Sequence, residues 1–128
     1  MLPLGVMKII KNEQIPTPAG HYSPVVEHAG TLYISGQIPR RVDGSIPEGI
    51  EAQTKLVFDK LSQLLAAAGS STDRVVLVRI YLPDIALWDE VNSLYADFFG
   101  EHKPARCVVP TTPLHYGCLI ELEAIAAA

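Results

Sequence analysis

The sequence is poor in cysteine, has no excess of basic residues and contains no long apolar run. Two cysteines in 128 residues cannot build a disulfide framework, and they suggest a reducing compartment, so we expect a cytoplasmic protein. Ten Lys and Arg against 14 Asp and Glu give a net charge of −4, which argues against nucleic acid as a partner. No segment approaches the roughly 20 apolar residues of a membrane span, and residues 1–11 lack the basic start and cleavage site of a secretion signal.

What the chain does have is enough apolar material for a core. Hydrophobic residues make up 48% of the sequence, which is ample for a domain of this size. The sequence shows no internal repeat, low-complexity run or linker. We therefore expect residues 1–128 to form a single domain.

Short apolar runs bounded by turn residues predict a sheet of several strands. Ala29 and Gly30 form a two-residue connection typical of a tight hairpin turn. The run "RVVLVRIYLP" has so few polar residues that both of its faces are expected to be buried. The predicted strands are 6–11, 25–28, 31–35, 74–83, 105–110 and 119–126.

Two segments have the spacing of amphipathic helices. Apolar positions recur at helical intervals in residues 48–68 and again after Asp84, up to about Gly100. Ser45 and Glu48 have the spacing of a capping box for the first helix, and Asp84 is the expected cap of the second. The order of elements predicts an α+β sheet with both helices on one face. The other face then needs a cover, and self-association is the expected one.

The last strand carries two carboxylates, Glu121 and Glu123, in an apolar run. Because side chains alternate along a strand, both would lie on one face, about 7 Å apart at 3.3 Å per residue. One interpretation is a sheet with one wet face. The other is a functional pair, because Leu119 and Ile125 bracket the two carboxylates on the same face.

Arg106 is the basic residue that the predicted topology could bring beside these glutamates. Antiparallel neighbouring strands would place it next to Glu121 or Glu123, either as a structural ion pair or as a fork that binds a substrate carboxylate. Cys107 would point to the opposite face and is expected to be a buried structural thiol. His115 and Cys118 fall short of a zinc ligand set, so no metal is predicted.

Several stretches, taken in order, resemble one protein family. They are "GHYSPVV", "LYISGQIP", "LLAAAGSS", "VVLVRIYLPD", "VNSLYADFF", "PARCVV" and "LIELEAIA", and they run from about residue 15 to the end. The chain is similar to the Rid/YjgF family of reactive intermediate deaminases, formerly named L-PSP endoribonucleases. The resemblance implies a chorismate-mutase-like mixed sheet that assembles as a homotrimeric barrel with clefts between subunits. It also implies hydrolysis of 2-imino or 2-enamino acids to 2-keto acids and ammonia, without metal or cofactor.

The resemblance also implies roles for individual residues. Arg106 matches the arginine that grips the substrate carboxylate, and Glu121 matches the glutamate that positions the water. Glu123 would then be structural, paired with a basic residue at a subunit contact. The further positions that match the family's substrate-binding residues are Tyr22, Ser35, Gly36 and, through its backbone, Val108.

The sequence departs from the usual family pattern at His21 and in the loop 111–118, which bears on the preferred imino acid. Three other functions stay open beside the deaminase. One is a non-catalytic protein that binds a small carboxylic acid in the same cleft. A ribonuclease or translation inhibitor is disfavoured by the negative charge and the absence of a basic stripe, and a chaperone-like holdase would need exposed apolar surface.

Overall fold

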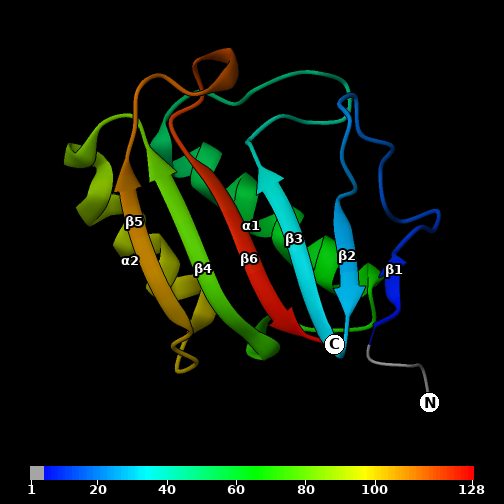
Figure 1. Ribbon diagram of the computed structural model, residues 1–128. Coiled ribbons are helices and arrows are strands. Elements are labelled where there is room, and N and C mark those ends of the chain that lie inside the picture. Colours follow the sequence, from blue (N-terminus) through cyan, green and yellow to red (C-terminus); the bar gives the residue numbers. More distant parts are fainter. Residues whose placement is uncertain (1–4) are drawn as a thin grey trace.

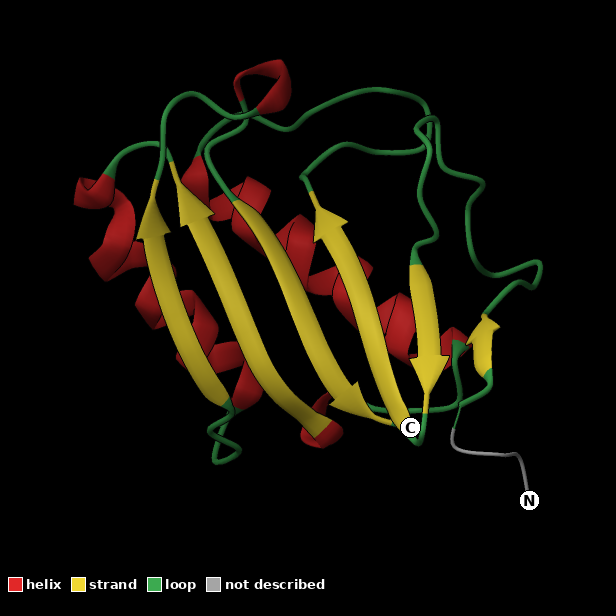
Figure 2. Ribbon diagram, viewed as in Figure 1, coloured by secondary structure: helices red, strands yellow, loops and turns green. Residues whose placement is uncertain are grey.

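The computed structural model describes residues 5–128, so the first four residues of the predicted domain lie outside it. One six-stranded sheet has the order β1-β2-β3-β6-β4-β5, and both helices pack on the same face of it (Figures 1 and 2). The strands are β1 (Met7–Ile9), β2 (Val25–His28), β3 (Thr31–Gln37), β4 (Val75–Leu82), β5 (Ala105–Pro110) and β6 (Glu121–Ala127). The helices are α1 (Ile50–Ala67) and α2 (Trp88–Phe99). The predicted α+β sheet with two helices on one face is confirmed.

The sheet is antiparallel except at one edge. The chain leaves β4, forms α2 and returns as β5, so β5 pairs with β4 in parallel. The last strand, β6, inserts between β3 and β4 and is antiparallel to both. This insertion puts the two glutamates of β6 in the middle of the sheet, with β4 between them and β5 (Figure 1).

The hairpin of β2 and β3 forms as the sequence predicts. Ala29 and Gly30 both have positive φ, 52° and 80°, which is the backbone of a two-residue type I′ turn. The turn fixes the register, so that Val25 lies opposite Ile34 and both side chains are buried.

The helices occupy the predicted segments, but their caps differ from the prediction. The N-cap of α1 is Gly49, and the predicted capping box is wrong because the Ser45 hydroxyl donates to Asp43 within the preceding turn, at 2.7 Å. Asp84 accepts from the backbone N–H of Ala86 and caps the short turn Ile85–Leu87 that leads into α2. The sequence spacing therefore located the ends of both helices to within about three residues, but the hydrogen bonds that cap them differ from those predicted.

The core lies between the helices and the sheet. Leu61 and Leu65 of α1 face Leu32, Ile80 and Leu122 of the sheet, and all five are completely buried. Burial of each such side chain stabilises the fold by about 1.5–3 kcal/mol. Neither helix among residues 5–128 is long and apolar enough to cross a membrane.

The opposite face of the sheet carries no helix (Figure 2). Along β4, Val78 and Ile80 point to the helices and are buried, whereas Arg79 and Tyr81 point to the open face and are half-exposed. The prediction that both faces of this strand are buried is therefore wrong for the single chain. The open face also exposes Tyr33, which lies opposite Ile125, so apolar surface lies there without a cover.

Candidate active site

Glu121 lies in a depression on the open face of the sheet. The depression has a volume of about 330 Å³, and its lining residues come from four segments: Gly36 on β3, Tyr81 on β4, Leu114 in the loop before β6, and Glu121 and Glu123 on β6. The two glutamates share this face because side chains alternate along β6. The two interpretations of this pair are therefore compatible: the glutamates lie on the face of the sheet that no helix covers, and there they line one depression.

Gly36 gives the Glu121 carboxylate its space. A Cβ atom at position 36 would overlap the Oε2 atom of Glu121, so only glycine leaves the carboxylate where it is. The pairing of β3 with β6 shifts between Ile34 and Gln37, which puts the bulge at Ser35 and Gly36. Ser35 fixes this bulge, because its hydroxyl donates to the backbone oxygen of Ser23 at 2.6 Å.

Glu121 and Glu123 have different surroundings. The Tyr81 hydroxyl donates to the carboxylate of Glu123, and Arg79 lies 3.9 Å from the same carboxylate. This hydrogen bond raises the pKa of Tyr81 to about 12. Among residues 5–128, by contrast, the Glu121 carboxylate has no hydrogen-bond or ion-pair partner. The predicted structural role of Glu123 is consistent with these contacts, although its partners belong to its own chain.

Burial raises the pKa of the Glu121 carboxyl, and the charge of Glu123 raises it further, while His115 lowers it. A carboxylate that is half-desolvated and unpaired is a stronger proton acceptor than one in water. Glu121 can therefore orient a water molecule and take a proton from it.

Arg106 is held in a cage of side chains from α2. Its guanidinium donates to Oδ1 of Asn92 at 2.8 Å and lies over the rings of Tyr95 and Trp88, 4.7 and 5.6 Å from their centroids. Tyr95 is buried with its hydroxyl unpartnered, and burial raises the pKa of Tyr95 to about 12. This cage was not predicted from the sequence, although its signal is present there: Trp88, Asn92 and Tyr95 have the spacing that puts them along one side of a helix.

The prediction that Arg106 lies beside Glu121 or Glu123 is wrong within one chain. Arg106 is opposite Val78 and shares its face, the one that the helices cover, whereas Glu121 is opposite Tyr81 on the open face. The strand β4 also separates the two residues, because β6 does not pair with β5. Two strand spacings of about 4.8 Å and three residues of about 3.3 Å put their Cα atoms about 14 Å apart.

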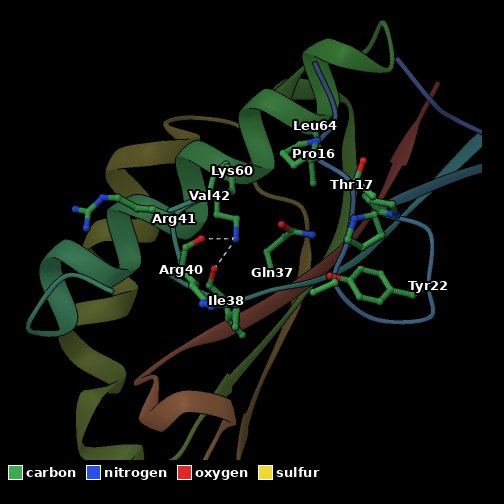
Figure 3. Close-up of a pocket in the computed structure, with 13 residues that line it drawn as sticks. Pro16, Thr17, Tyr22, Gln37, Ile38, Arg40, Arg41, Val42, Lys60 and Leu64 are labelled. Atoms are coloured by element: carbon green, nitrogen blue, oxygen red, sulfur yellow. Dashed lines mark hydrogen bonds between the residues drawn. The ribbon is translucent and has the colours of Figure 1, made fainter. Parts of the chain in front are cut away.

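Tyr22 and Val108 are also away from the Glu121 depression. Tyr22 is 52% exposed and lines a separate cavity of about 250 Å³ (Figure 3). In that cavity Lys60 donates to the backbone oxygens of Ile38 and Arg40 at 2.7 and 3.1 Å, and burial lowers the pKa of Lys60. Val108 lies on the edge strand β5, two residues beyond Arg106 and on the same face.

Cys107 and the loop 111–118 complete the predicted site residues. Cys107 points to the open face as expected, but it is exposed, so the prediction of a buried thiol is wrong in the single chain. In the loop, the rings of His115 and Tyr116 are stacked at 3.8 Å. Residues 5–128 contain no group of three or more His, Cys, Asp or Glu side chains placed to hold a metal ion.

The family model Endoribonuclease L-PSP, which covers the Rid/YjgF proteins, matches residues 12–128. The chain is 41% identical over 123 residues to a RutC family protein of Pyrococcus horikoshii, covering 93% of this chain and 96% of that protein. It is 33% identical over 123 residues to a 2-iminobutanoate/2-iminopropanoate deaminase of Rattus norvegicus, covering 94% of this chain and 90% of that protein.

A solved structure of E. coli TdcF with bound serine superposes with a TM-score of 0.87 at 30% identity, covering 94% of this chain and 98% of that chain. A match over nearly the whole chain, in both sequence and fold, shows the family. The protein belongs to the Rid/YjgF family.

Proposed function

We propose that this protein is a deaminase that hydrolyses reactive 2-imino and 2-enamino acids to 2-keto acids and ammonia. The observation that carries the proposal is the Glu121 carboxylate, half-buried, unpaired within residues 5–128 and given its space by Gly36. The resemblance to the rat deaminase supports the reaction, and the serine bound to TdcF supports an amino-acid-sized ligand.

The site needs two copies of the chain. In a 2-imino acid the carboxylate carbon is bonded directly to C2, so the group that binds the carboxylate and the group that delivers water must lie within a few ångströms of one small molecule. Arg106 and Glu121 of one chain lie on opposite faces of the sheet. We therefore assign Arg106 of one copy and Glu121 of a second copy to each cleft.

The open face of the sheet is where copies would meet. It presents Tyr33, Leu77 and Ile125 among its half-exposed and exposed residues, and burying such side chains drives association. Closed rotational symmetry would repeat the same cleft at each contact, as in the homotrimer that the family resemblance implies. The proposed active form is therefore a homotrimer with three clefts.

The proposed reaction uses positioning and one proton carrier. The Arg106 guanidinium binds the substrate carboxylate with two hydrogen bonds, with Tyr22, Gly36 and the backbone of Ser35 and Val108 lining the cleft. An enamine first tautomerises to the imine. Water then adds to C2 and gives its proton to Glu121, which passes it to the nitrogen. The hydroxyl group of the resulting carbinolamine then gives its proton to the freed Glu121 carboxylate as the C2–N bond breaks, which leaves the carbonyl of the 2-keto acid and releases ammonia.

This chemistry calls for no cofactor, because the C2 atom of an iminium ion is already electrophilic. The two thiols, Cys107 and Cys118, form no disulfide in the structure and suit a reducing compartment. We therefore place the activity in the cytoplasm.

The test generates imino acids in place with an amino-acid oxidase or a dehydratase and follows loss of the imine by semicarbazide trapping. We expect wild type to accelerate imine loss. Glu121→Gln should lower kcat/KM by about 100-fold, since it removes the proton acceptor and keeps the shape of the side chain. Arg106→Ala should lower kcat/KM by roughly 10- to 100-fold through KM, since hydrogen bonds to a charged group are worth about 1.5–3 kcal/mol.

The matched controls are Glu13→Gln and Arg74→Ala, both at exposed positions outside the site, and both should keep wild-type rates. A wild type that accelerates no imine across a panel of side chains would overturn the deaminase. If a small carboxylic acid then binds wild type and not Arg106→Ala, the protein is a binding protein that uses the same cleft.

A further inference from the structure

Glu123 takes both of the polar partners that β4 offers to the two glutamates. In the register of β4 and β6, Tyr81 lies opposite Glu121 and Arg79 lies opposite Glu123. The Tyr81 hydroxyl nevertheless donates to Glu123, along the diagonal, and Arg79 faces the same carboxylate at 3.9 Å. The neighbour directly opposite Glu121 is thus turned away from it.

This arrangement is informative because the two carboxylates are otherwise alike. They lie on one face of one strand, two residues apart, and line the same depression. A cross-strand tyrosine directly opposite a carboxylate is within reach of it. Without Glu123, the hydroxyl of Tyr81 and the guanidinium of Arg79 would have Glu121 as their nearest remaining carboxylate on this strand.

We propose that Glu123 is a positioning residue for Glu121: it holds the Tyr81 hydroxyl and the Arg79 guanidinium away from the catalytic carboxylate and keeps a second carboxylate beside it on the open face of β6. This inference rests on the proposed deaminase function and adds to it a second acidic residue of the site. Glu123 itself does not touch the substrate.

The groups that face Glu121 agree with this role. On β3 its neighbour is Gly36, which carries no charge. The pKa of Glu121 is raised by burial and by Glu123, and lowered by His115. Removing the charge of Glu123 while keeping its shape should therefore lower the pKa of Glu121. The titratable and charged groups around Glu121 are Glu123 on β6, Arg79 and Tyr81 on β4, and His115 and Cys118 in the loop before β6.

The proposed reaction explains why such tuning matters. Glu121 must accept a proton from water and then give the same proton to the nitrogen that leaves as ammonia. A carboxyl whose pKa lies nearer the working pH performs both transfers better than one that stays ionised throughout. An exposed, unpaired glutamate would be a weak proton acceptor. A glutamate that is already protonated could not take a proton from water. The balance between the ionised and protonated forms of Glu121 therefore sets the rate.

The experiment compares Glu123→Gln with wild type by two readouts. The first follows the side-chain carboxyl carbon of Glu121 by NMR during a pH titration, in protein labelled at the glutamate carboxyl carbons, with Glu121→Gln used to assign the signal. The second is the acidic limb of the pH profile of kcat/KM. The amide oxygen that Glu123→Gln introduces can still accept the hydrogen bond from Tyr81, so the substitution removes charge and keeps geometry.

We expect both the Glu121 titration and the acidic limb to move to lower pH in Glu123→Gln. Glu123→Asp, which keeps the charge, should leave the titration of Glu121 closer to its wild-type position. Glu13→Gln, at an exposed position outside the site, should move neither readout. An unchanged Glu121 titration in folded Glu123→Gln would overturn the inference.

The two proposals fail in different ways. A wild type without imine hydrolysis refutes the deaminase, yet the NMR titration still reports whether Glu123 controls the protonation of Glu121. If the wild type is active and loses activity in Glu121→Gln, but Glu123→Gln leaves the titration where it was, then the deaminase stands and the role of Glu123 is wrong.

Discussion

Gly36 is the residue whose identity the geometry of the site constrains most tightly. Its φ lies outside the left-handed region, so an alanine there would carry no backbone strain. The three atoms nearest to an added Cβ all belong to the side chain of Glu121. The end of a glutamate side chain can move away at little cost, so the conflict affects the placement of the carboxylate more than the stability of the fold.

We predict that Gly36→Ala lowers kcat/KM for imine hydrolysis by up to about 100-fold, because a displacement of about 1 Å at a reacting group can cost that much. The free energy of unfolding should change by less than about 1 kcal/mol. Steady-state kinetics and urea unfolding measure the two effects. Gly5→Ala, where an added Cβ meets nothing within 4 Å, is the control. Wild-type kinetics in Gly36→Ala would show that the position of the Glu121 carboxylate is not critical.

At the residue scale, the sequence correctly predicted that the two glutamates share one face of the sheet. It did not predict which side chains would contact them. Strict alternation along a strand places Glu121 and Glu123 together, and this needs no knowledge of neighbours. The diagonal bond from Tyr81 depends on a register between residues 42 positions apart in the chain, which periodicity does not contain. The strongest local clue to that bond is "RIYL", where Arg79 and Tyr81 alternate with buried residues.

At the scale of elements, α1 ends at Ala67, one residue before the end of the helical spacing in the sequence. Gly69 follows the helix with φ of 80°, its N–H donates to the Ala66 oxygen at 3.0 Å, and the Ser70 N–H donates to the Leu65 oxygen at 2.8 Å. This pair of bonds satisfies carbonyls that the helix leaves free. Because an added Cβ there would meet no atom within 4 Å, the requirement for glycine is conformational alone.

We predict that Gly69→Ala lowers the free energy of unfolding by about 1 kcal/mol, since the left-handed conformation disfavours a Cβ atom. Gly69→Asn is the matched variant and should lose less, because asparagine tolerates this conformation better. Urea unfolding at one fixed protein concentration measures both, since assembly would add a concentration term. Equal losses for the two variants would contradict a backbone cause.

The order of strands is where the predictions from sequence fell short. Each strand was found from its own apolar pattern, but the chain order suggested that β5 and β6, which follow one another, would be neighbours. The parallel return through α2 instead places β5 at the edge, and β6 inserts beside β4. Consecutive strands are often adjacent, and here that tendency gave the wrong partner for Arg106.

At the scale of the whole molecule, the separation of Arg106 from Glu121 makes a prediction about mixed assemblies. Arg106→Ala and Glu121→Gln chains, each with the reduced kcat/KM expected of the single variant, should regain activity when they are co-expressed with different tags and purified as mixed oligomers. A cleft works when the copy that supplies Arg106 carries only the Glu121→Gln change and its neighbour carries only the Arg106→Ala change. Random assembly from equal amounts would give about a quarter of the wild-type rate.

The controls are the two single variants taken through the same purification, and a mixture of the separately purified proteins without subunit exchange. Both should keep the low rates of the single variants. Mixed oligomers that carry both tags and are no more active than the single variants would show that the two residues do not combine across copies, and the two-copy cleft would then be wrong.

The exposed thiol of Cys107 lies on the open face of the edge strand β5, so its reactivity depends on whether that face is covered. Cys118 lies buried in the same chain and provides an internal reference that assembly leaves unchanged. In a lone chain Cys107 is open to oxidants and electrophiles, whereas in an assembly that covers the open face it is shielded. Freshly made or dissociated chains would then be the ones vulnerable to alkylation, and assembly would protect the Cys107 thiol as well as complete the proposed cleft.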